Sequence, residues 1–377
     1  MPESKLKIQL LLPSIFLTKN GFNLSIFIKY NAKKREQNSI NLFKQQLKKS
    51  SAVLKKSSCR LANRVQQVVA TDLSFTTTGW GTDELIQRTI ARDVHIDYER
   101  GMVGQGRYGS VWRANWNGDQ VAVKVFLSMH ESSWSRETDI YQTCMLRHEN
   151  ILGFIASDIK GNGCSVSMLL ITEYHANGSL YDYLVTHTIE SKRLLVKLLF
   201  TTASGLHHLH QEIFGTAYKP AIVHRDLKTK NILVKANFEC CIADFGLAVR
   251  YNSQTNRMDH EPNFGSMVKI REGSTRYMAP ECLDESLNAE SINDLRRTDI
   301  YSYALVIWEL LSRFTFRGEH MIGEHRPPYY EFVSGDPSVQ LMKDIVCLKK
   351  IRPHISSRLE EDDVSAFVWE RFNPTSK

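Results

Sequence analysis

A run of eight residues in the second half of the chain constrains its fold more than any other feature. Residues 224–231 read HRDLKTKN and match the pattern H-R-D-L-x-x-x-N at every fixed position. The triplet DFG begins 18 residues after Asp226, and the triplet APE follows at 279–281. A single triplet is a chance event in a chain of 377 residues, but this order and spacing is not. These motifs therefore predict that the chain contains a catalytic domain.

A glycine-rich segment precedes these motifs. Residues 104–111 read GQGRYGSV and match G-x-G-x-x-G-x-V. Glycines let backbone N–H groups approach phosphate oxygens closely. A glycine-rich hairpin without a catalytic role fits the segment alone equally well. A dinucleotide-binding turn requires a strand, the glycines and then a helix, and here the glycines lie between two expected strands.

Lys124 is the candidate phosphate-binding cation. It lies within the apolar run 121–126, 15 residues after the last of these glycines. A lone lysine in a strand usually faces solvent, but the match to V-A-I-K favours a contact with the phosphates of ATP. A helix is expected from Ser133 to Met145, and it carries Glu137 as the predicted partner of this ammonium. Glu131 is the alternative, and the phase of the helix favours Glu137.

Together these segments resemble a protein kinase domain. The resemblance implies an α+β bilobal fold, with a small β-rich lobe over 93–175 and a larger helical lobe over 176–377. It implies that Asp226 orients the substrate hydroxyl and accepts its proton, while Asn231 and Asp244 hold Mg²⁺ or Mn²⁺. Lys228 and the nearby hydroxyl of Ser274 indicate serine/threonine specificity. The residues expected to bind ATP are Val103, Gly104, Gly106, Gly109, Val111, Lys124 and Glu137.

Residues outside these motifs resemble one kinase family more closely. Residues 94–353 look like the kinase domain of type I receptors of the transforming growth factor-β superfamily. The segments that carry the likeness are 87–91 (QRTIA), 145–154 (MLRHENILGF), 219–222 (KPAI) and 276–281 (RYMAPE). Within the family the chain is most similar to the bone morphogenetic protein branch, through 158–161 (DIKG), 178–184 (GSLYDYL) and 283–288 (LDESLN).

This resemblance implies a receptor kinase that a type II receptor activates and that phosphorylates Smad proteins. A BMP-like ligand is implied only if an ectodomain lies upstream. The loop expected to select the Smad contains Ile159, Lys160, Gly161, Asn162 and Gly163. Its structural alternative is a variable connection between strands. In the regulatory segment 71–92, the family's Ser-Gly repeat is replaced by residues that include the candidate phosphate acceptors Thr76, Thr77 and Thr78. Thr82-Asp83 replaces the Leu-Pro that holds an inhibitory immunophilin, so that partner is not expected.

Charge is distributed unevenly along the chain. Residues 1–70 contain 14 Lys or Arg and two acids, a balance of +12, so the remaining residues carry −5 within the total of +7. A basic arm of this kind is expected to be mostly disordered. It lacks a stacking platform of aromatic residues, which disfavours nucleic-acid binding. By resemblance, the arm corresponds to the juxtamembrane segment of a receptor at the cytoplasmic face of the plasma membrane. The sequence contains no run of 18 apolar residues, so the chain as written is expected to be cytoplasmic.

One alternative to an enzyme remains open from the sequence. The chain stops at Lys377, before the last helix of the larger lobe is expected. A missing helix leaves apolar surface uncovered, which fits a catalytically weak binding module or decoy. The complete set of catalytic residues favours the enzyme.

Overall fold

The computed structural model describes residues 17–18, 21–22, 82–106, 108–161, 166–215, 217–259, 270–315 and 323–354, and only the backbone of 17–18, 21–22 and 82–86. The chain divides into two units, Met1–Ser74 and Phe75–Lys377. In the first unit, strands β1 (Leu17–Thr18) and β2 (Gly21–Phe22) pair antiparallel. The rest of the predicted basic arm lies outside the described residues, as do the predictions about the chain beyond residue 354.

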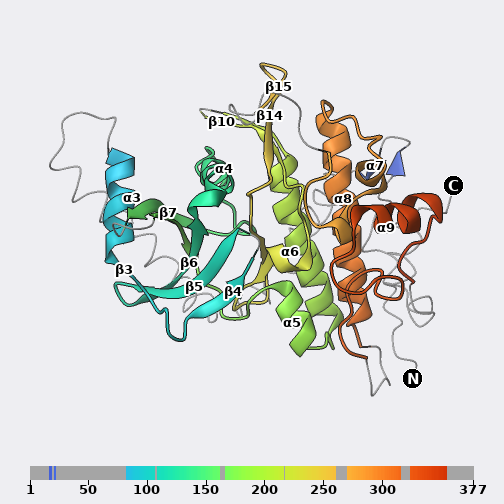
Figure 1. Cartoon of the computed structure of the whole chain (residues 1–377), viewed down its shortest axis with the longest axis horizontal. Helices are drawn as coiled ribbons and strands as arrows, with labels where there is room; N and C mark the ends of the chain where they lie inside the picture. Colours follow the sequence, from blue (N-terminus) through green and yellow to red (C-terminus); the bar gives the residue numbers. More distant parts are fainter. Residues whose placement is uncertain are drawn as a thin grey trace, which may run out of the picture. The chain divides into compact units, whose positions relative to one another are not determined.

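An antiparallel sheet forms the first half of the second unit (Figure 1). Its strands run in the order β3-β5-β6-β8-β7, and β4 pairs with the free part of β5. They are β3 (Val94–Ile96), β4 (Met102–Gln105), β5 (Gly109–Trp116), β6 (Asp119–Leu127), β7 (Phe154–Gly161) and β8 (Val166–Glu173). β5 and β6 are joined at Asn117 and Gly118, whose φ angles of 52° and 90° suit a type I′ hairpin turn. The glycine-rich segment joins β4 to β5, with Gly104 in β4 and Gly109 at the start of β5, so the glycines lead from a strand into another strand as the sequence predicts.

Two helices accompany this sheet. Helix α3 (Thr82–Asp93) precedes β3 and contacts β7. Helix α4 (Glu131–Tyr141) follows the short helix η2 (Ser128–His130) and contacts β6 and β8. The expectation that this helix extends to Met145 is wrong. The N–H of Thr143 bonds to the carbonyl of Ile140, which tightens the chain, and Met145 has φ of +59°, which no α-helix accommodates.

The second half of this unit is mainly helical. Its longest helices are α6 (Lys192–His210) and α8 (Ile292–Ser312), which contact each other. Leu198 and Leu206 of α6 and Leu310 of α8 are fully buried. Helix α5 (Leu180–Thr186) begins with a capping box, in which the side chains of Ser179 and Asp182 each accept a hydrogen bond from the other's backbone N–H. The shorter helices are η4 (Thr275–Tyr277), α7 (Pro280–Leu283), α9 (Val339–Lys343) and η5 (Asp344–Leu348). A β-rich half followed by a helical half confirms the predicted bilobal α+β fold.

Short buried strands position the catalytic motifs. The HRD segment follows β11 (Ala221–Val223) and leads through η3 (Thr229–Asn231) into β12 (Ile232–Val234). β12 pairs with β13 (Cys240–Ile242), which ends just before the DFG triplet. β14 (Val249–Asn252) then pairs with β11 and with β15 (Arg257–Met258), and β9 (Ile213–Phe214) pairs with β10 (Tyr218–Lys219). Because β11, β12 and β13 are almost wholly buried, the polar loops at their ends have fixed starting points.

Candidate active site

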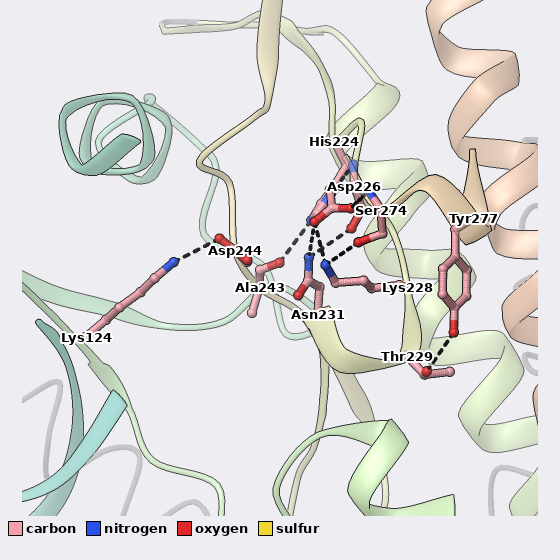
Figure 2. Close-up of polar contacts among 10 residues, drawn as sticks. All are labelled: Lys124, His224, Asp226, Lys228, Thr229, Asn231, Ala243, Asp244, Ser274 and Tyr277. Carbon is pink, nitrogen blue, oxygen red and sulfur yellow. Dashed lines mark hydrogen bonds and ion pairs between the residues drawn. The ribbon is translucent and has the colours of Figure 1, made fainter. Parts of the chain in front are cut away.

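Lys124 joins the two halves of the second unit. In β6 it lies opposite Val111 of β5 and Leu170 of β8. Its ammonium lies 2.8 Å from Oε2 of Glu137 on α4 and 2.9 Å from Oδ1 of Asp244 in the DFG triplet (Figure 2 draws the second contact). The structure therefore brings Lys124 to Glu137, the carboxylate that helix phase favoured over Glu131.

The protonation equilibria of this cluster follow from burial and charge. Burial alone lowers the pKa of Lys124, but the carboxylates of Asp244 and Glu137 outweigh it and raise the pKa above its ordinary value. Burial raises the pKa of Glu137, and the charge of Lys124 opposes that shift. Burial also acts to raise the pKa of Asp244, but Lys124 reverses the direction and lowers it. Asp244 thus keeps the charge that a metal ligand needs, and Lys124 stays cationic.

The carboxylate of Asp226 is held from three sides (Figure 2). Lys228 donates to Oδ2 at 2.8 Å, and the amide nitrogen of Asn231 donates to Oδ2 at 3.1 Å and to the Asp226 carbonyl at 2.9 Å. The backbone N–H of Ser274 donates to Oδ1 at 2.7 Å. Lys228 also donates to the hydroxyl of Ser274 at 2.6 Å. These contacts fix the orientation of a carboxylate that is only partly buried and can still meet a substrate.

His224 connects the two catalytic segments. Its Nδ1 accepts from the backbone N–H of Asp226 at 3.2 Å, so Nε2 carries the proton and donates to the carbonyl of Ala243 at 2.9 Å. Since Ala243 directly precedes Asp244, this buried ring links the position of the catalytic loop to that of the DFG triplet. The sequence match included His224 without giving it a role.

Asp299 is a functional residue that the sequence reasoning missed. It lies on α8, fully buried, and accepts from the backbone N–H groups of His224 and Arg225 at 2.8 Å each. His210 of α6 lies 2.8 Å from the same carboxylate. Arg225 has φ of +69°, an unfavourable conformation for a long side chain, which these bonds help to hold. A signal was available, because Asp299 falls on the otherwise buried face of α8.

Gly273 places Ser274 beside the catalytic loop. Its φ is +109°, and a Cβ at this position would lie 2.7 Å from the carbonyl oxygen of Arg225 and 3.2 Å from Oδ1 of Asp226. Only glycine fits without displacing the loop. The Gly-Ser pair is therefore required by the close approach of these two segments, and the hydroxyl that the sequence singled out does reach Lys228.

A second buried carboxylate supports the segment after Ser274. Glu309 of α8 accepts from the phenol of Tyr277 at 2.6 Å and from the hydroxyl of Thr229 at 3.1 Å. His325 also lies 2.9 Å from this carboxylate. Burial and the neighbouring Glu309 raise the pKa of Tyr277 well above its ordinary value, so the phenol keeps its proton and donates. Glu309 thereby ties the residue after Lys228 to the segment that carries Ser274.

The structural surroundings of the three glycines in the predicted phosphate loop differ. A Cβ on Gly104 would meet no atom within 4 Å, so its backbone is open to a ligand. The N–H of Gly106 donates to the carbonyl of Gly109 at 2.9 Å and closes the turn. A Cβ on Gly109 would lie 2.1 Å from the carbonyl oxygen of Val125, so contact with β6 requires this glycine whatever the ligand. Val103 is exposed, next to Gly104.

The predicted regulatory and selecting residues are only partly described. Ile159, Lys160 and Gly161 end β7, where Ile159 is half-exposed and Lys160 donates to the carbonyl of Ala91 on α3 at 2.7 Å. Asn162 and Gly163 lie outside the described residues, as do Thr76, Thr77 and Thr78.

The donor set suits a magnesium ion bound together with a nucleotide. Within the described ranges, no three His, Cys, Asp or Glu side chains form a metal-binding group. Mg²⁺ commonly uses one or two protein oxygens together with phosphates and water. Asp244 could supply such an oxygen, and Asn231 uses its amide nitrogen on Asp226, which leaves its amide oxygen free to face a cation. The described part of the chain contains no helix long and apolar enough to cross a bilayer.

Comparisons with known proteins agree with this geometry. A family model described as "Protein kinase domain" matches residues 98–327. Over 287 residues the chain is 50% identical to TGF-beta receptor type-1 of Rattus norvegicus and of Homo sapiens, covering 76% of this chain and 55% of each receptor. Over 285 residues it is 48% identical to activin receptor type-1 of Gallus gallus, covering 76% and 54%. The chain thus spans about half the length of these relatives. It belongs to the protein kinase family, and its kinase domain is similar to those of TGF-beta and activin type-1 receptors.

Proposed function

We propose that the protein is a serine/threonine kinase that transfers the γ-phosphate of ATP to hydroxyl groups of protein substrates. The observation that carries the proposal is the contact of Lys228 with both Asp226 and Ser274, at 2.8 and 2.6 Å. This arrangement places an ammonium beside the carboxylate that receives the substrate proton. A cation there stabilises the charge of the phosphoryl group during transfer.

Each residue of the site has a role in this reaction. Lys124, held by Glu137, positions the α- and β-phosphates beneath a glycine-rich loop in which the backbone of Gly104 is open. Asp226 orients the acceptor hydroxyl and takes its proton. Asp244 and Asn231 would hold Mg²⁺ or Mn²⁺, which neutralises phosphate charge when bound. The remaining ATP contacts are assigned to Val103, Gly106, Gly109 and Val111. Positioning and charge stabilisation supply most of the acceleration, because phosphoryl transfer requires little covalent chemistry of the protein.

We assign the chain to receptor signalling on the basis of its similarity to receptor kinases. The proposed substrates are Smad proteins, and the proposed activator is a type II receptor kinase acting at the cytoplasmic face of the plasma membrane. Bone morphogenetic protein-like specificity rests on the sequence segments quoted above, with the loop from Ile159 to Gly163 as the selecting element. Residues 71–92 form the proposed regulatory segment and 93–377 the kinase domain.

Purified protein with ATP, Mg²⁺ and a Smad C-terminal peptide tests the activity. We expect the wild type to phosphorylate serine, and Lys124→Arg and Asp226→Asn to incorporate at least about 100-fold less phosphate, because each removes a group that acts on the phosphates or the acceptor. A wild type that incorporates no more phosphate than these variants contradicts the proposal and favours a binding module.

The regulatory segment has a separate test in cells that supply a type II receptor. Changing Thr76, Thr77 and Thr78 to Val removes the proposed phosphate acceptors and should abolish activation, while basal transfer by the purified variant stays unchanged. Normal activation of the triple variant would exclude these threonines as the regulatory site.

A further inference from the structure

An ionic cluster outside the catalytic site joins α4 to the strands that follow the DFG triplet. Asp259 comes directly after β15, and its Oδ2 accepts from Nη1 of Arg136 on α4 at 2.9 Å. Arg250 of β14 donates to both carboxylate oxygens, through its side-chain Nε to Oδ2 and through its backbone N–H to Oδ1 at 2.7 Å. One carboxylate therefore holds an arginine of the helix and an arginine of the β14–β15 hairpin.

The hairpin contacts α4 at a second point. Nη1 of Arg250 donates to the backbone carbonyl of Asp139 at 3.2 Å and to the hydroxyl of Thr143 at 3.4 Å. Asp139 lies in the last turn of α4, whose carbonyl groups lack partners within the helix. An arginine at a helix C-terminus satisfies such a carbonyl and interacts favourably with the helix dipole. The hairpin thus contacts the middle of α4 and its end.

Arg136 directly precedes the residue that holds the catalytic lysine. Neighbours in a helix point about 100° apart, so Glu137 reaches the sheet at Lys124 while Arg136 reaches the hairpin at Asp259. The side chain of Arg136 is only 10% exposed, and that of Asp259 is 27% exposed. This pair is more shielded from solvent than an ordinary surface salt bridge, so we expect it to contribute more than one.

We propose that Arg136 and Asp259 are positioning residues that hold α4 where Glu137 can reach Lys124. The hairpin that follows the DFG triplet acts as a clasp on the helix, and the clasp and the Lys124–Glu137 pair hold α4 from two sides. Both residues lie outside the proposed catalytic site, so they act through Glu137. The catalytic part of this inference rests on the proposed kinase function.

Kinetics of the full chain test the clasp. Asp259→Asn and Arg136→Met should each raise KM for ATP about 5- to 10-fold and lower kcat, with KM for the protein substrate within about twofold, because only the lysine that positions ATP loses its support. The double variant should be no worse than the more impaired single variant, because either change opens the clasp. Arg136→Lys keeps the charge and should recover part of the loss. Arg297→Met removes an exposed pair with Asp294 on α8 and serves as the control that changes neither constant.

Hydrogen exchange gives a readout that does not depend on phosphate transfer. Amides of 131–141 should exchange at least about tenfold faster in Asp259→Asn than in the wild type, while amides of α8 stay unchanged. Faster exchange confined to α4 supports the clasp even if the wild type transfers no phosphate, a result that would contradict the proposed function alone. Unchanged exchange in α4, or a KM for ATP within twofold of wild type in both folded single variants, contradicts the clasp.

Discussion

Replacing Asp299 by Asn tests whether a buried carboxylate holds the catalytic loop. Oδ1 accepts from the N–H of Arg225, and Oδ2 accepts from the N–H of His224 and contacts Nε2 of His210, each at 2.8 Å. An asparagine keeps one oxygen and places an NH₂ group against the donors on the other side. The variant therefore loses the charge at this site and places its NH₂ group against at least one backbone N–H donor.

The magnitude follows from these contacts. Losing a hydrogen bond to a charged group costs about 1.5–3 kcal/mol, and a buried N–H left without an acceptor costs about 1–3 kcal/mol. We expect a loss of about 3–5 kcal/mol in the free energy of unfolding, the range seen when one partner of a buried pair is removed. For a domain of this size the melting temperature should fall by roughly 10 °C. The catalytic loop loses its anchor at the same time, so kcat should fall at least about tenfold.

Thermal unfolding by circular dichroism, with kcat measured on the same preparation, checks this expectation. Asp294→Asn is the matched control, because Asp294 lies on the same helix, is partly exposed and pairs with Arg297 at 2.7 Å. This control should lower the free energy of unfolding by less than about 1 kcal/mol.

Burial acts to raise the pKa of Asp299, but the hydrogen bonds from His210 and His224 outweigh it and lower the pKa. The difference between wild type and Asp299→Asn should therefore persist at neutral pH and shrink only as pH falls below about 3.8, the ordinary value. A melting temperature lowered no further than in Asp294→Asn would refute this account.

Two further expectations concern a backbone contact and a buried cation. Gly273→Ala should lower kcat at least about tenfold with little change in KM for ATP, because the new Cβ would lie 2.7 Å from the carbonyl oxygen of Arg225. Steady-state kinetics measure both constants, and an unchanged kcat contradicts the expectation. Lys219 is fully buried and bonded to three backbone carbonyls, including that of Leu209, and burial lowers its pKa to about 7. Between pH 7 and 9 the unfolded chain then binds more protons than the folded chain. The free energy of unfolding of the wild type, measured in urea, should therefore rise by up to about 1.4 kcal/mol per pH unit relative to that of Lys219→Met. Parallel pH profiles of the two proteins would exclude a shifted lysine.

The sequence predicted those parts of the site that are contiguous or lie at fixed spacing. The HRD and DFG motifs give the catalytic residues directly, and helix phase selected Glu137 because the correct face of α4 can be counted from sequence. The bilobal fold was expected from the resemblance of these motifs to a protein kinase domain. The end of α4 was not predicted correctly. A local hydrogen bond from the N–H of Thr143 and the left-handed conformation of Met145 end the helix, and the spacing of apolar residues reveals neither.

The supporting residues could not be found this way, because tertiary contacts define them. Asp299 lies 75 residues from His224 along the chain, and Asp259 lies 123 residues from Arg136. No spacing rule joins such pairs, although a carboxylate on the buried face of an apolar helix is a usable warning in the case of Asp299. The role of Gly109 was also incomplete from sequence, since the approach of Val125 in the neighbouring strand depends on register.

We propose that Asp226, Lys228 and Ser274 form a site for phosphoryl transfer to aliphatic hydroxyl groups. The most direct measurement is mass spectrometry of a peptide set that differs only in carrying Ser, Thr or Tyr at one position, incubated with ATP, Mg²⁺ and the full chain. We expect phosphoserine and phosphothreonine, no phosphotyrosine, and a loss of about 100-fold or more in Asp226→Asn. Phosphotyrosine as the main product, or equal incorporation by wild type and Asp226→Asn, would contradict the account.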